Sequence, residues 1–197
     1  MNQTSARYTK TAKILHWLIA IAIFGMFALG WYMSELPKEA PKQMAYDLFD
    51  WGVYTWSLSE EVSPRTFYFN LHKSIGVTIF ALILFRIFWR LTHKAPALLA
   101  SYKAWESKLA KNVHRLLYVL MVALPLSGLM MAIASKYGVK WFGLAFIGGL
   151  DNTPLREAFK EVHIVIGLVI LFIIIVHILG ALKHKFIDKD ETLDRML

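Results

Sequence analysis

Residues 163–182 read HIVIGLVILFIIIVHILGAL and contain no Asp, Glu, Lys or Arg. Twenty helical residues, at about 1.5 Å each, cross about 30 Å, the thickness of the hydrocarbon core of a bilayer. The two histidines of this stretch, His163 and His177, are fourteen residues apart. That spacing is close to four helical turns, so both imidazoles are expected on nearly one face, about 21 Å apart. The stretch predicts a transmembrane helix with imidazoles at two depths.

Three more apolar runs of spanning length occur at residues 14–33, 71–91 and 116–134. The segments between the runs contain helix-breaking residues, namely Pro37, Pro41, Pro64, Pro96, Gly148, Gly149 and Pro154. The first run follows basic residues, as in a signal peptide, but it has spanning length and no small-residue cleavage site, so we expect it to remain as a helix. The sequence predicts an all-α membrane protein, with residues 1–197 forming one four-helix transmembrane bundle.

Composition excludes several other classes of protein. The chain has 197 residues, of which 57% are hydrophobic, and this is too apolar for a soluble domain of that length. The net charge of +8 comes from cations that lie between apolar runs and form no basic stripe, so we expect no nucleic-acid partner. The absence of cysteine excludes disulfides, thiolate metal sites, iron–sulfur clusters and covalent c-type haem attachment. Any cofactor must be held by other ligands.

The positions of the cations indicate orientation, because Lys and Arg near span ends are retained on the cytoplasmic side. They concentrate in both terminal tails and the middle linker, at Arg7, Lys10, Lys13, Arg90, Lys94, Lys103, Lys108, Lys111, Arg115, Lys183, Lys185, Lys189 and Arg195. The outer loop of residues 35–65 is acidic, whereas the second outer loop carries cations of its own and weakens the contrast. We therefore expect both termini in the cytoplasm.

Four histidines pair by depth under this topology. A histidine within a span is costly unless it faces a partner inside the bundle, so each one marks a candidate site. His72 and His163 lie near the outer ends of their helices, and His16 and His177 lie toward the inner ends. Facing imidazoles suit the two axial positions of a haem iron, and an apolar macrocycle suits the core of a bundle. The sequence predicts two haem b groups, the outer held by His72 and His163 and the inner by His16 and His177.

Other ligands and cofactors fit these histidines less well. A closed zinc site needs four ligands together, whereas these histidines divide into twos. Two axial histidines leave no open position on iron, which favours electron transfer over oxygen binding. A single histidine of this kind could instead be an ordinary hydrogen-bonded contact between helices.

Three more residues are candidates for roles at the inner end. His114 could replace His16 as a ligand or lie beside the haem. Arg86 follows His72 by fourteen residues and could neutralise haem propionates, although snorkelling to the head groups explains it equally well. His184 follows His177 by seven residues and could exchange protons with a quinone, or it could be a solvated residue of a basic tail. His93 is expected to be a surface residue.

Two features of the outer side bear on the electron donor. Cations could steer an anionic donor toward the outer haem or contact anionic lipid, namely Lys73, Lys136, Lys140, Arg156 and Lys160. The aromatic-rich loop of residues 35–65 could cover the outer haem, although an interfacial amphipathic segment is the favoured interpretation. The four glycines Gly76, Gly128, Gly167 and Gly180 could admit the histidine rings, but ordinary helix packing explains them better.

Several motifs resemble the bacterial cytochrome b561 family, four-helix diheme proteins of the inner membrane. The matching pieces are Leu15-His16-Trp17, the stretch LHKSIG at residues 71–76, His163 with His177, and the tail LKHKFIDKDETL at residues 182–193. The resemblance implies the same two ligand pairs, membrane quinone as a redox partner, and a position near the quinone for His184. For some members it also implies oxidation of superoxide at the outer face. The loop of residues 35–65 is longer than in compact members.

These observations support one leading function and two alternatives. The leading hypothesis is a diheme b-type cytochrome that transfers electrons between a periplasmic donor, either superoxide or a redox protein, and the membrane quinone pool. Under this hypothesis the protein is an electron-transfer cytochrome or a superoxide:quinone oxidoreductase. The first alternative is a haem b anchor subunit that exchanges electrons with a partner dehydrogenase or hydrogenase. The second is a haem-free scaffold or transporter, which leaves the deep histidines unexplained.

Overall fold

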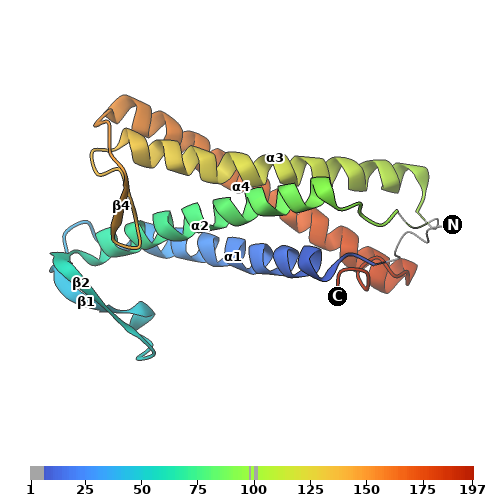
Figure 1. The fold of residues 1–197 in the computed structure, drawn as a ribbon, viewed down its shortest axis with the longest axis horizontal. Coiled ribbons are helices and arrows are strands. Elements are labelled where there is room, and N and C mark those ends of the chain that lie inside the picture. The colour runs from blue at the N-terminus through green and yellow to red at the C-terminus, as the bar shows by residue number, and fades with distance from the viewer. Residues whose placement is uncertain (1–6, 98, 100–101) are drawn as a thin grey trace.

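Four long helices form an antiparallel up-and-down bundle in the computed structural model, which describes residues 7–97, 99 and 102–197 (Figure 1). They are α1 (Lys10–Glu35), α2 (Pro64–Thr92), α3 (Ala104–Ala134) and α4 (Thr153–Lys183). All four are long and apolar enough to cross a membrane. The predicted four-helix transmembrane fold is confirmed. We call the end with Lys10 and Lys183 the inner end, and the opposite end the outer end.

The helices are longer than the apolar runs because they continue into polar sequence and end in caps. The side chains of Thr9, Ser63 and Asn152 each accept a hydrogen bond from a backbone N–H of the first turn that follows. Pro64 and Pro154 lie in the first turns of α2 and α4, where proline costs no hydrogen bond. These two prolines therefore begin helices, whereas the sequence suggested that they break them.

Lipid-facing side chains cover much of the outside of the bundle. Leu168 and Phe172 of α4 are 65% and 63% exposed, whereas Ile170 between them is fully buried. Inside, Ile19 of α1 packs with Ile79 and Ile83 of α2. Such an apolar exterior requires hydrocarbon around it, since exposing so large an apolar surface to water is unfavourable.

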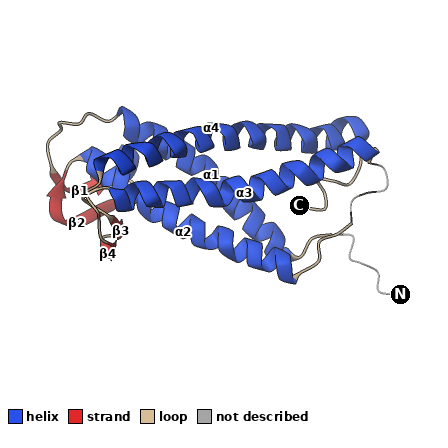
Figure 2. Ribbon diagram, turned by 90° about the horizontal axis from the view of Figure 1, so that it is seen from above, coloured by secondary structure: helices blue, strands red, loops and turns tan. Residues whose placement is uncertain are grey.

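Two β-hairpins that the sequence did not predict lie at the outer end (Figure 2). Strands β1 (Gln43–Asp47) and β2 (Thr55–Val62) pair antiparallel, with a 3-10 turn (Leu48–Asp50) between them. Strands β3 (Val139–Trp141) and β4 (Leu144–Ile147) form the second hairpin, between α3 and α4. The strands of both hairpins are short, so the long apolar segments that predict the helices do not reveal the hairpins.

The loop of residues 35–65 thus contains a β-hairpin that packs on the bundle, and its location at the membrane interface stays a prediction. The Tyr46 ring of β1 stacks on Phe67 of α2, with centroids 4.4 Å apart. Trp56 of β2 stacks on Phe142 of the second hairpin at 6.0 Å, and the Lys140 ammonium lies 2.9 Å from the Glu60 carboxylate. The hydrogen bond from Lys140 lowers the pKa of Glu60. Aromatic packing and one ion pair therefore join the two hairpins.

Ser74 of α2 fastens the second hairpin to the bundle. Its hydroxyl lies 3.1 Å from the Lys140 carbonyl and accepts a hydrogen bond of 2.9 Å from the Phe142 backbone N–H. Lys73 next to it donates to the Gly138 carbonyl at 3.2 Å. Because His72 directly precedes these two residues, the hairpins fix the outer part of α2 at the position of a candidate ligand.

Candidate functional site

The structure brings the four paired histidines together in twos, one pair toward each end of the bundle. At the outer pair, the rings of His72 (α2) and His163 (α4) have centroids 6.4 Å apart and planes at 81°. At the inner pair, the rings of His16 (α1) and His177 (α4) have centroids 6.2 Å apart and planes at 72°. Helix α4 supplies one imidazole to each pair.

These separations fit a metal ion held between two imidazoles. A metal–imidazole nitrogen bond is about 2.0–2.1 Å long. The ring centre lies about 1.2 Å beyond that nitrogen, given ring bonds of about 1.35 Å. Two rings on opposite sides of one metal therefore have centroids about 6.4 Å apart. Both pairs have this spacing, so the residues present fit two axially ligated haem groups.

The second nitrogen of His163 is held by α3. Its Nδ1 lies 3.0 Å from the Leu124 carbonyl oxygen and 3.1 Å from the Ser127 hydroxyl. A proton on Nδ1 that is donated to a carbonyl leaves the lone pair on Nε2, which is the tautomer that a metal ligand needs. The buried Nδ1 of His72 has no hydrogen-bond partner within the described residues.

Two glycines give the outer histidines their space. A Cβ added at Gly128 would lie 2.9 Å from Cε1 of His163, closer than such atoms approach, and one at Gly30 would lie 3.6 Å from Cε1 of His72. Of the four glycines considered from the sequence, Gly128 alone meets a histidine ring. Gly76 faces Met26, Gly167 faces Phe27 and Leu124, and Gly180 faces open space. Gly30 was not singled out, because a glycine in an apolar run gives no sign of the ring opposite.

Arg86 points toward the inner pair. Its Nη2 lies 3.2 Å from Nδ1 of His16, and its buried Nε has no partner in the described part of the chain. The guanidinium also lies over the Tyr118 ring, at 6.0 Å. A buried cation with an unused donor suits a carboxylate such as a haem propionate. Its Nη1 also lies 3.5 Å from the Ala12 carbonyl, in the first turn of α1, so snorkelling toward the inner head groups stays an alternative.

His114 lies beside the inner pair. Its ring centroid is 5.2 Å from that of His177, which is shorter than the separation that two opposed ligands need. It lies ten residues after the start of α3. The geometry therefore favours His16 over His114 as the partner of His177.

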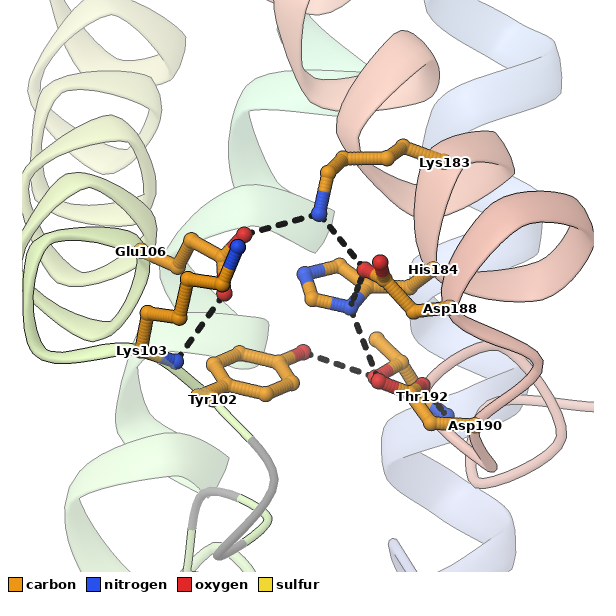
Figure 3. A network of polar contacts seen from close by, with 8 residues as sticks. All are labelled: Tyr102, Lys103, Glu106, Lys183, His184, Asp188, Asp190 and Thr192. Carbon is orange, nitrogen blue, oxygen red and sulfur yellow. Dashed lines mark hydrogen bonds and ion pairs between the residues drawn. The ribbon is translucent and has the colours of Figure 1, made fainter.

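His184 is buried at the inner end, at only 9% exposure, so it is not a solvated residue of a basic tail. Its ring stacks on Tyr102 with centroids 4.3 Å apart, and its Nδ1 lies 2.8 Å from the Asp190 carboxylate and 3.0 Å from that of Asp188 (Figure 3). Burial would raise the pKa of Asp190, but hydrogen bonds from Thr192 and His184 hold it below its usual value. Tyr102 lies in the linker before α3, where no sequence pattern points to it.

Lys183 balances the acids around His184. Its ammonium lies 2.7 Å from the Glu106 carboxylate and 2.6 Å from Asp188 (Figure 3). His184, Asp188 and Asp190 are close enough to share a metal ion, but the Lys183 ammonium already contacts the Asp188 oxygen that such an ion would need. The cluster is thus an ion-paired polar network.

The outer cations are mostly engaged with other groups. Lys140 pairs with Glu60, and both Arg156 and Lys160 pair with Glu157, at 2.6 and 3.2 Å. Lys73 is bonded to the Gly138 carbonyl, and Lys136 lies over the Tyr137 ring. Such pairing weakens the field that would steer an anion. At the other end, His93 is exposed, as expected, and stacks on Trp89.

Comparisons with known proteins agree with the resemblance drawn from the residues. The profile of one family, prokaryotic cytochrome b561, matches residues 7–197. Cytochrome b561 homolog 2 of Escherichia coli (strain K12) is 32% identical over 196 residues, covering 98% of this chain and 93% of that protein. Cytochrome b561 homolog 1 of the same strain is 28% identical, with 97% of each chain covered. The probable superoxide oxidase CybB of Yersinia pestis is 26% identical over 93% of this chain and 91% of its own.

The contact of Gly128 with His163 gives a testable prediction. The Cβ of Gly128→Ala would displace the His163 ring, so we expect the purified variant to lose most of the haem bound at the outer pair. Gly180→Ala is the matched control, because its Cβ meets nothing within 4 Å. Haem per protein, measured as the pyridine haemochrome, reports the outcome. Equal haem content in the two variants would contradict the geometry.

Proposed function

The chain belongs to the prokaryotic cytochrome b561 family, and from this premise we propose that it is a two-haem cytochrome that passes electrons between an outer donor and membrane quinone. Membership makes it a multi-pass protein of the bacterial inner membrane and implies haem b as its cofactor. The number of haems, the quinone and the donor belong to the proposal. The inner end faces the cytoplasm in this proposal, because the cations concentrate there.

One observation carries the proposal, namely the two histidine pairs with the spacing that a shared metal requires. A haem b bound at each pair supplies a one-electron redox centre. The two histidines of each pair would hold the iron of such a haem, and this would leave no position for oxygen or another small ligand. The surrounding helices exclude water, and Arg86 offers a positive charge to a propionate.

His184 is the residue that we propose to serve the quinone. Quinone reduction takes two protons with two electrons, so a group that exchanges protons is needed at the quinone. Asp190 binds Nδ1 of the imidazole, which orients the ring. Nε2 is then the nitrogen that exchanges a proton with a quinone oxygen. The position of His184 at the inner end supports this role, because protons are taken from the cytoplasm there.

Superoxide is the first candidate for the donor. The relative named a probable superoxide oxidase supports this choice. Each superoxide that gives up one electron becomes dioxygen, so two of them balance the reduction of one quinone to quinol. Three of the five outer cations pair with two carboxylates, Glu60 and Glu157, which weakens the attraction for such an anion without cancelling it.

A partner enzyme is the second candidate, which makes the chain a haem b anchor subunit. The turn of the first hairpin supports it, since Trp51, Val53 and Tyr54 are 73%, 81% and 60% exposed. Aromatic side chains of this kind are enriched where proteins dock. The hairpin lies beside the outer end of the bundle (Figure 1), and in this proposal its turn would contact the periplasmic partner.

The ligand pairing predicts how haem is lost on mutation. His72→Ala is expected to remove the outer haem and leave the inner one, and His16→Ala is expected to do the reverse, because each substitution opens one pair. Redox titration of the α-band in purified protein distinguishes the two haems by potential. Loss of the same component in both variants, or of neither, would refute the pairing.

The choice of donor is tested in liposomes that contain quinone. If superoxide is the donor, adding it to the outside is expected to form quinol faster than the spontaneous reaction, and the acceleration should disappear in His72→Ala. A protein whose haems are reduced by dithionite but which gives no acceleration is not a superoxide oxidase. Copurification with a dehydrogenase or hydrogenase would then support the anchor subunit.

A further inference from the structure

The C-terminal tail, residues 189–197, folds back across the inner end and contacts the beginning of α1. The indole N–H of Trp17 donates to the Met196 carbonyl at 2.9 Å, and the Tyr8 backbone N–H donates to the Arg195 carbonyl at 3.4 Å. The Lys13 ammonium donates to the Leu197 carbonyl. Residues 195–197 are therefore bonded to α1 at two points and to Tyr8, just before α1, at a third.

The same tail is bonded to the linker before α3 and to the end of α4. The Arg195 guanidinium donates to the Ala97 carbonyl at 2.7 Å, and the hydroxyls of Tyr102 and Thr192 lie 2.8 Å apart. Lys185 pairs with Asp194 at 2.7 Å. The tail thus connects three parts of the molecule that are distant in the sequence.

This connection matters because His16 lies on α1 and His177 on α4, and these two helices pack mainly against other helices and not against each other. The close backbone contacts of α1 are chiefly with α2, and those of α4 are chiefly with α3. The separation of His16 from His177 therefore depends on how the two helix pairs sit against each other. Trp17 directly follows His16, and the two rings meet edge to face, with centroids 5.3 Å apart. A displacement of the Trp17 side chain therefore also displaces the His16 ring.

We propose that the tail is a clamp that positions His16 against His177. Trp17 is the positioning residue on α1, and the ordered network of Asp190, His184 and Tyr102 anchors the tail at α4. The inference rests on the proposed function only in taking His16 and His177 as the inner haem ligands. It gives a physical role to residues 192–197, which the electron-transfer proposal leaves unused.

The clamp predicts a selective weakening of the inner haem. Trp17→Phe keeps the aromatic ring but removes the N–H donor, and deletion of residues 192–197 removes the tail contacts while keeping Asp190 for His184. Loss of one hydrogen bond should speed release of the inner haem about 2- to 12-fold, and the deletion should speed it further. Trp141→Phe is the matched control, because it loses an indole bond to Thr78 at the outer end.

Transfer of haem to an excess of apomyoglobin measures the release without any donor or quinone. Trp17→Phe, the deletion and Trp141→Phe are each made in two backgrounds. His72→Ala leaves only the inner haem to be measured, and His16→Ala leaves only the outer haem. Faster release of the inner haem alone supports the clamp. Equal acceleration of both haems, or no change in either, overturns it. Failure of quinone reduction in the same protein would count against the proposed function and leave this test intact.

A second measurement needs no haem. The chain has no cysteine, so spin labels can be placed at Ile14→Cys and Leu179→Cys, on exposed positions of α1 and α4. The distribution of distances between the labels is expected to broaden in Trp17→Phe and in the deletion, and to stay narrow in Trp141→Phe. An unchanged distribution in all three proteins would overturn the clamp, even if a variant loses its haem.

Discussion

Placing imidazoles inside a hydrocarbon-embedded bundle is the constraint on which the rest of the structure depends. A polar ring buried without a partner is costly, so each of the four must face another group across the core. Helix α4 presents a histidine at each of two depths, and because His163 and His177 are fourteen residues apart, both lie on nearly one face. The other ligands then have to come from helices opposite that face. The rings of α1 and α2 fill those places, at 6.2 and 6.4 Å.

Different devices hold the two pairs at that spacing. At the outer pair, carbonyl and hydroxyl groups of α3 orient His163, Gly128 leaves space for its ring, and hairpins fastened through Ser74 restrain α2. At the inner pair, Arg86 contacts His16 directly, and the tail joins α4 to α1. Segments outside the hydrocarbon therefore restrain the buried histidine rings at both ends: the hairpins at the outer end and the C-terminal tail at the inner end. The positions of the paired histidines depend on these polar ends as much as on helix packing.

The sequence alone predicted the features that depend on long apolar segments or on the spacing of distinctive residues. Apolar length predicted the four spans, and histidine depth predicted which rings lie together. Helix bounds were predicted too short, since caps such as Ser63 and Asn152 lie in polar sequence beyond the apolar runs. The hairpins and the partners of His184 were missed because they are tertiary contacts. Nothing local in the sequence shows that Tyr102 stacks on a histidine eighty-two positions later, or that Trp17 meets the chain end.

Electron paramagnetic resonance of the oxidised, purified protein tests the central claim most directly, because it reports the axial ligands of each ferric iron. The account predicts two low-spin signals, both strongly anisotropic as crossed imidazole planes require, given the 81° and 72° between the paired rings. Each signal should disappear when one histidine of its pair is replaced. A high-spin signal from the intact protein, a single low-spin haem, or no haem signal would contradict it.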